Sequence, residues 1–185
     1  DYNKLGPTHY CPNDISLLIK ANCKNIFLPW NEKDAEKFIL SIMKKKAYSY
    51  LRLSSEEINE KIKPRDISEF LEVNKVEDII IGLGTDSFVL SNYLKLKLDY
   101  SVSIIDDNLI ELIKKIISKG INITILAGFN LDFLLNLLSS NSNNKNLIKS
   151  GYLNLIYSID SKFDTAEEKI THLTSNIKNN KFFLK

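Results

Sequence analysis

The fold of this chain is decided by the stretch Asp78-Ile79-Ile80-Ile81-Gly82-Leu83-Gly84-Thr85-Asp86-Ser87. An unbroken aliphatic run is typical of a parallel strand that is buried on both faces. The glycines favour a tight turn, and the apolar residues that follow Ser87 recur at helical spacing. The stretch therefore predicts a buried strand, a turn and a helix, which together begin an α/β unit.

The chain beyond this stretch keeps alternating between strand and helix patterns. Helices are expected over 88–94, 108–118 and 131–138, and strands over 101–105, 121–126 and 152–159. The polar Ser/Asn run at 139–146 is typical of a loop, and Thr165 to Glu168 begin a capped final helix that 173–177 continue or follow. The alternation predicts a compact, Rossmann-like three-layer α/β domain over 76–185.

A smaller α/β pattern precedes it. Residues 25–28 read as a strand that Pro29 ends, and 47–53 alternate as a second strand. Between them a helix is expected to begin at the N-cap Asn31 with Asp34 at its third position. The apolar positions of this helix predict one buried face, made of Ala35, Phe38, Ile39, Ile42 and Met43. Because two strands are too few to cover the helices, residues 1–55 are expected to be part of a parallel layer.

The composition becomes charged between Ser54 and Val76. Few apolar residues interrupt this stretch, which is typical of a connection that crosses a surface. We expect a linker over 56–75, with at most a short strand or turn near 67–73.

Length and charge limit the classes of protein to consider. The chain has 185 residues, of which 44% are hydrophobic, and 25 basic residues stand against 23 acidic ones. This balance gives no electrostatic footprint for nucleic acid. Two cysteines and two histidines suggest neither a disulfide framework nor a zinc site. No apolar run reaches the length of a membrane span, so a cytoplasmic protein without membrane partners is expected. The absence of an initiator methionine suggests the tail of a longer polypeptide.

The opening stretch Gly6-Pro7-Thr8-His9-Tyr10-Cys11-Pro12-Asn13-Asp14 is the main candidate for function. Its prolines and glycine predict a loop, and Asn13 or Asp14 can cap the helix that follows. His9 therefore lies on a turn just before a helix, where its imidazole can exchange a proton or donate a hydrogen bond. The alternative interpretation is that His9 only stabilises the turn.

A strand that runs into a glycine turn, as at Gly82 and Gly84, is also how nucleotide and S-adenosylmethionine sites begin. The third glycine of that pattern is replaced by Ser87, although Asp106 or Asp107 could supply the acidic residue after the next strand. A plain strand-to-helix turn is the alternative.

The motif Gly6-Pro7-Thr8-His9, followed by Asn13-Asp14-Ile15, a strand ending at Pro29, a helix and the strand Tyr50-Leu51-Arg52-Leu53-Ser54, resembles the later part of the pyrimidine-binding domain of the transketolase family. The stretch from Ile79 to Thr85 is similar to the first strand of that family's C-terminal domain. The resemblance covers nearly the whole chain.

The resemblance implies an enzyme that transfers a two-carbon ketol unit between sugars with thiamine diphosphate and Mg²⁺. It implies that His9 is catalytic, through hydrogen bonds to substrate hydroxyls and stabilisation of an oxyanion, and that Thr8 and Asp14 bind substrate. Family members carry the metal-diphosphate motif, Gly-Asp-Gly, and the glutamate that activates the cofactor in parts that have no counterpart here. The chain alone is therefore expected to be inactive, and to need a homodimer or a complementary subunit that carries the diphosphate-binding domain.

The chain departs from the family pattern at two places. Leu5 stands where transketolases often have an acidic residue, and Ser54-Ser55 stand where many have an arginine that holds the sugar phosphate. Arg52 lies inside the alternating strand and is expected to be structural. A non-catalytic remnant or dimerisation domain of the same family is therefore an alternative, and a domain that binds S-adenosylmethionine or a nucleotide is a more distant one.

Overall fold

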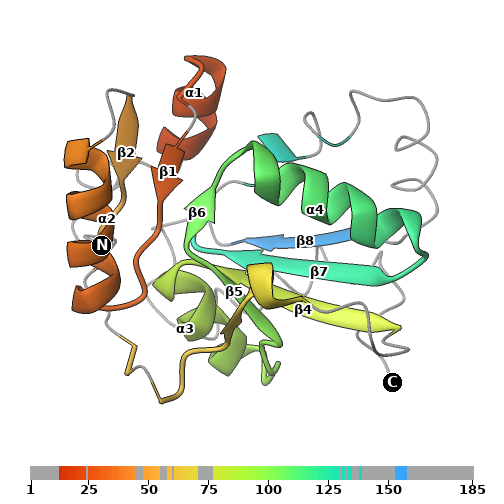
Figure 1. Cartoon of the computed structure of the whole chain (residues 1–185). Helices are drawn as coiled ribbons and strands as arrows, with labels where there is room; N and C mark the ends of the chain where they lie inside the picture. The colour runs from red at the N-terminus through yellow and green to blue at the C-terminus, as the bar shows by residue number, and fades with distance from the viewer. Residues whose placement is uncertain are drawn as a thin grey trace.

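The computed structural model describes residues 13–23, 25–44, 48–54, 58–59, 61–70, 77–129, 131, 133–134, 138 and 153–157. These residues form a mixed α/β structure with two sheets (Figure 1). The larger sheet has the order β3-β5-β4-β7-β8 and the smaller has the order β2-β1-β6.

The centre of the larger sheet is β4, Asp78–Leu83, which lies between β5, Tyr100–Val102, and β7, Asn122–Ala127. All three strands are parallel, and β8, Leu153–Tyr157, continues the sheet beyond β7. The aliphatic run of β4 is buried at Ile79, Ile81 and Leu83. The prediction of a buried parallel strand in this stretch is confirmed.

Two helices lie on opposite faces of this sheet (Figure 1). The helix α3, Thr85–Tyr93, follows the turn at Gly84, and α4, Asp107–Ser118, connects β6 to β7. Asp106 caps α4, because its Oδ1 accepts a hydrogen bond of 2.9 Å from the backbone N–H of Leu109. The predicted helices over 88–94 and 108–118 are confirmed, whereas the expected helix over 131–138 is described only in part.

The smaller sheet is built around β1, Asn25–Phe27, which follows the short helix α1, Asp14–Lys20. It pairs in parallel with β2, Ser49–Leu51, across the helix α2, Glu32–Lys44. On its other side β1 pairs in antiparallel with β6, Ile104–Ile105. The strands and the helix predicted for this part of the chain are confirmed.

The two sheets are joined by one length of polypeptide. β5 pairs with β4 in the larger sheet, and β6, which begins two residues after β5 ends, pairs with β1 in the smaller sheet. The backbone N–H of Leu28 also donates to the carbonyl of Ser103, between β5 and β6, at 2.8 Å. Buried residues of both sheets consequently form one hydrophobic core, with Ile15, Ile26 and Leu28 packed among the aliphatic residues of β4, β7 and α4.

The buried face predicted for α2 is wrong in part. Phe38 is buried and its ring centroid lies 4.8 Å from that of Phe27, but Ile39 is 47% exposed and Met43 is 79% exposed. The physical reason is the size of the surface beneath the helix. Strands of three residues offer room for little more than one aromatic side chain, so the rest of the apolar stripe faces outward.

The charged segment expected to be a linker contributes to the larger sheet. β3, Arg65–Asp66, pairs with β5, and the 3₁₀ helix η2, Ile67–Glu69, follows it. Ile58 and Ile67 are buried. The division of the chain into two domains stays a prediction, but part of the segment between them packs into the core. Residues 139–146 and the expected final helix lie outside the described residues, while the strand expected over 152–159 is confirmed as β8.

No helix in the described part of the chain is both long and apolar enough to cross a membrane.

Candidate functional site

Of the three residues predicted to form the site, the structure describes one. Thr8 and His9 lie outside the described residues, and Asp14 is the first residue of α1. Asp14 therefore fixes where the loop with His9 joins the described structure.

Asp14 meets the end of β2 through its carboxylate. Its Oδ2 accepts a hydrogen bond of 2.8 Å from the hydroxyl of Tyr50 and forms an ion pair of 2.5 Å with Nη1 of Arg52. The two charged side chains are 12% and 13% exposed, so solvent screens this pair less than it screens a surface ion pair. Asp14 already holds a tyrosine and an arginine, so it positions the start of α1 against β2.

Arg52 extends the contact to the larger sheet. Its guanidinium carbon lies 5.4 Å from the ring centroid of Phe129, within the range of a cation–π interaction. Phe129 follows β7, so the side chain of Arg52 lies between the carboxyl ends of β2 and β7. These contacts agree with the expectation that Arg52 is structural, because its charge is balanced inside the protein.

A second polar contact lies beside it. The hydroxyl of Ser54 donates a hydrogen bond of 2.7 Å to Oδ1 of Asp86, which is in the first turn of α3. Asp86 packs closely on Gly128, because a Cβ on that glycine would lie 2.3 Å from the Cβ of Asp86. The polar groups at the carboxyl ends of β2, β4 and β7 are thus bonded to one another.

The glycine turn before α3 is covered by the smaller sheet. Gly84 has a φ of 67°, and a Cβ at this position would lie 3.2 Å from the Cβ of Leu28. The hydroxyl of Thr85 donates to the carbonyl of Pro29 at 3.1 Å. The cavity at this turn has a volume of about 10 Å³, which is room for one water molecule. A nucleotide would have to displace Leu28 and Pro29, so the geometry favours a plain strand-to-helix turn.

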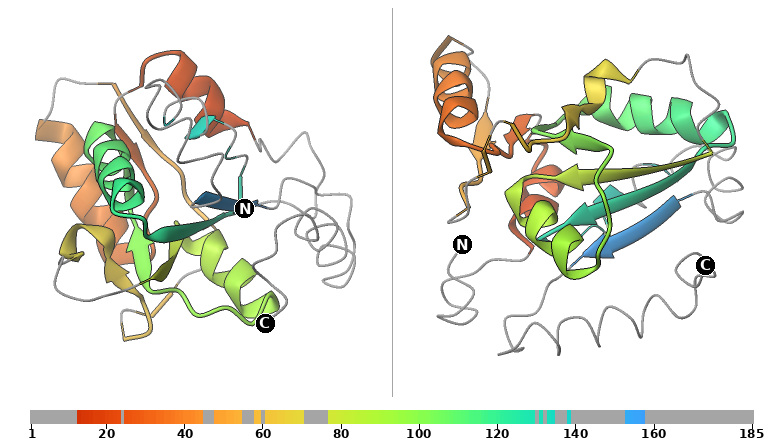
Figure 2. Two further views of the ribbon diagram at one scale, coloured as in Figure 1. Left: turned by 90° about the vertical axis from the view of Figure 1, so that its right-hand side faces the viewer. Right: turned by 90° about the horizontal axis from the view of Figure 1, so that it is seen from below.

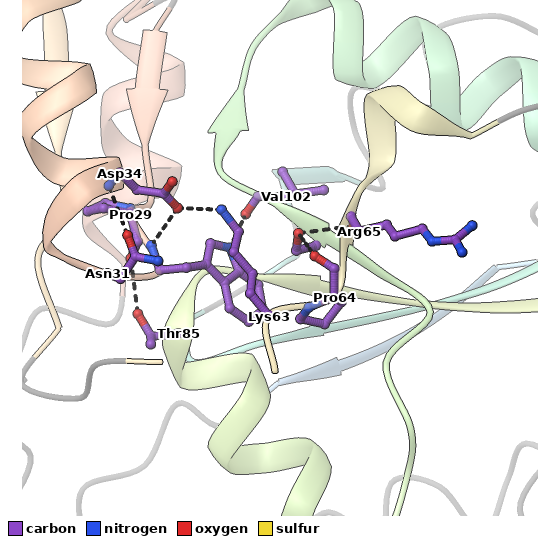
Figure 3. Close-up of polar contacts among 10 residues, drawn as sticks. Pro29, Asn31, Asp34, Lys63, Pro64, Arg65, Thr85 and Val102 are labelled. Carbon is purple, nitrogen blue, oxygen red and sulfur yellow. Dashed lines mark hydrogen bonds and ion pairs between the residues drawn. The ribbon is translucent and has the colours of Figure 1, made fainter. Parts of the chain in front are cut away.

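The start of α2 is fixed by a group of hydrogen bonds (Figure 3). Oδ1 of Asn31 accepts from the backbone N–H of Asp34 at 2.9 Å, and Oδ2 of Asp34 accepts from the backbone N–H of Trp30 at 3.2 Å. This confirms Asn31 as the N-cap of α2. Lys63 forms an ion pair with Asp34, and Nε1 of Trp30 donates to the carbonyl of Val102 at 3.0 Å. Four separate parts of the chain are therefore held together at this point.

A larger cleft lies next to this group. It has a volume of about 530 Å³ and lies between the start of α2, the segment 63–69, the strands β5 and β6, and the start of α4. Its size falls in the range of small-molecule sites. Its charged lining residues are Asp34, Lys37, Lys63, Asp66, Glu69 and Asp106. The sequence did not indicate this cleft, because its walls come from segments that are distant in the chain and carry no shared motif.

The described residues do not fit a magnesium site. No group of three or more His, Cys, Asp or Glu side chains in this part of the chain is arranged to hold a metal ion. Any ligands for Mg²⁺ and for a diphosphate must therefore come from outside the described residues.

Comparison with known proteins adds no family. No protein-family model matches the chain, and no curated protein gives a significant match to its sequence.

Proposed function

We propose that this chain is the C-terminal portion of a transketolase-like enzyme that transfers a two-carbon ketol unit between sugars. The observation that carries the proposal is the contact of Asp14 with Arg52. It places the end of the loop with Thr8 and His9 at the carboxyl edge of β2, next to the carboxyl ends of β4 and β7. The carboxyl edge of a parallel sheet is where α/β proteins bind their ligands.

The organisation of the chain supports the same proposal. A parallel strand pair with a crossover helix is followed by a parallel sheet with helices on both faces. This is the order of elements that the resemblance implies, with the later part of a pyrimidine-binding domain followed by a Rossmann-like, three-layer domain over 76–185. Residues 56–75 are then the connection between the two, although Arg65 and Asp66 pair with β5.

In this proposal the chain contributes His9 and another polypeptide segment contributes the cofactor site. Thiamine diphosphate, when bound, supplies the electron sink for the ketol unit. The histidine would donate a hydrogen bond to substrate hydroxyls and to the oxygen that becomes negative during the reaction, with Thr8 beside it. Asp14 would act by positioning the loop, because its carboxylate is engaged by Tyr50 and Arg52.

Two measurements test this function. Calorimetry of the isolated chain with thiamine diphosphate and Mg²⁺ should show no binding, because the described residues hold no metal site. Micromolar binding by the isolated chain would contradict this division of the cofactor site between two polypeptides.

The second measurement is ketol transfer in an assembly of this chain with a polypeptide that carries the Gly-Asp-Gly segment and the activating glutamate. His9→Ala should lower kcat by a factor of about 10² to 10⁴, the range of general acid–base contributions. Lys20→Ala, an exposed change at the end of α1, is the control and should leave the rate unchanged. An active assembly in which His9→Ala has no effect would refute the role of the histidine.

A second candidate function is a non-catalytic assembly domain of the same family. It is favoured by the exposed apolar side chains on α2, which are typical of a surface that another protein covers. The sequence encoded upstream of Asp1 separates the two functions. A Gly-Asp-Gly segment and an activating glutamate there would favour the enzyme, and their absence would favour the assembly domain.

A further inference from the structure

The outer face of α2 carries an apolar stripe that no described residue buries. Ile39, Leu40 and Met43 are 47%, 52% and 79% exposed. In Figure 2, α2 stands with β2 at one side of the molecule, away from β7 and β8. A shallow groove of about 550 Å³ runs along the helix and is lined by Lys33, Glu36, Lys37, Leu40, Ser41 and Lys44. The helix thus presents both projecting side chains and a groove to receive them.

The charges beside this stripe are arranged about its centre. Glu36 lies four residues before Leu40 and Lys44 lies four residues after it, which is about one helical turn in each direction. Both side chains are exposed, and neither forms an ion pair with another described residue. The stripe is therefore flanked by one negative and one positive end at equal distances from Leu40.

We propose that two copies of this chain associate through α2, with the helices antiparallel and a two-fold axis at Leu40. This symmetry places Glu36 of one copy opposite Lys44 of the second copy, and it does so twice. It also places the aliphatic stem of Lys37 beside Met43 of the second copy. A parallel arrangement would instead bring Glu36 to Glu36 and Lys44 to Lys44, and like charges at close range oppose association. The association involves this one surface and does not depend on ketol transfer.

The size of the contact sets the expected strength. A contact made mainly by one helix of 13 residues falls in the small class of protein interfaces, which are typically transient. We therefore expect a dimer with a dissociation constant of about 1 µM to 100 µM. Because the charged pairs lie at the solvent-exposed border of the contact, the association should weaken as salt rises.

Sedimentation velocity of the full chain over concentrations from about 1 µM to about 1 mM tests the association. Leu40→Asp should leave the chain monomeric, because it places two carboxylates at the axis. Leu17→Asp is the matched control, since Leu17 is a similarly exposed apolar residue on α1 at 59%, and it should leave the dimer unchanged. Circular dichroism confirms that both variants are folded.

Charge reversal tests the geometry. Glu36→Lys alone and Lys44→Glu alone should each weaken the dimer about 10-fold, because the symmetry turns two attractive contacts into repulsive ones. The double variant should regain the affinity of the original chain. A chain that stays monomeric to about 1 mM would overturn the association and would mean that a different polypeptide covers α2. A dimer in which the double reversal is no stronger than the single variants would overturn the antiparallel geometry.

Discussion

Replacing Trp30 tests whether the two sheets form one cooperative unit. The indole is fully buried in a cluster with Ile58, Leu90, Leu98 and Leu126. Its Nε1 donates to the carbonyl of Val102, which also accepts a hydrogen bond of 3.1 Å from the backbone N–H of Gly84. The single tryptophan of the chain therefore connects the start of α2 to the larger sheet.

The expected loss in the free energy of unfolding follows from these contacts. Trp30→Phe removes one hydrogen bond worth about 1 kcal/mol but leaves the carbonyl of Val102 with its other donor. The smaller ring leaves a partly filled cavity that costs about 1 kcal/mol more. We expect a total of about 2 kcal/mol for Trp30→Phe, and about 3 to 5 kcal/mol for Trp30→Ala.

Urea denaturation followed by far-UV circular dichroism measures both changes. The control is Tyr48→Ala, because Tyr48 is 93% exposed and its loss should change stability by less than about 0.5 kcal/mol. In the unchanged chain, the fluorescence of Trp30 and the circular dichroism should follow one transition. Two separate transitions, or a Trp30→Phe variant as stable as the unchanged chain, would refute the cooperative coupling of the two sheets.

Three further changes test local geometry through the same unfolding measurement. Gly84→Ala should cost about 1 kcal/mol, because the φ of 67° disfavours residues with a Cβ, and an unchanged stability would mean that the turn relaxes. Gly128→Ala should cost about 3 kcal/mol, because the new Cβ would lie 2.3 Å from the Cβ of Asp86; a cost below about 1 kcal/mol would show that α3 can move away. Asp14→Asn and Arg52→Met, alone and combined, should show a coupling energy of about 1 kcal/mol, and additive effects would show that their ion pair contributes nothing.

The sequence predicted those elements whose signal is local. The aliphatic run of β4 and the cap at Asp106 before α4 each identify themselves within about ten residues, and both were found where expected. Burial of α2 could not be predicted in the same way. Helical periodicity shows that Ile39 and Met43 share a face, but burial depends on the extent of the strands beneath the helix.

The candidate site divides along the same line. A motif of a few residues pointed to Thr8, His9 and Asp14, and the structure describes Asp14 alone among them. The role of Asp14 differs from the prediction in kind, because the ion pair with Arg52 depends on two residues 38 positions apart that no periodicity relates. The cleft of about 530 Å³ is assembled from four segments and left no pattern in the sequence.

The path of the chain from Tyr100 to Ile105 explains why a boundary in composition need not separate two folding units. Side-chain composition marks 56–75 as a connection, but backbone pairing is decided later in the chain, where β5 joins one sheet and β6 joins the other. Hydrogen bonds between main-chain groups tolerate little displacement, because an N–H or carbonyl that is pulled from its partner and kept from water loses about 1 to 3 kcal/mol. The pairing of Phe27 with Ile104 therefore holds the smaller sheet to the larger one more rigidly than a side-chain interface would. A loop that ends at Asp14 is then held, through Arg52 and Phe129, by the same body that carries α3, so His9 begins only five residues from a fixed point.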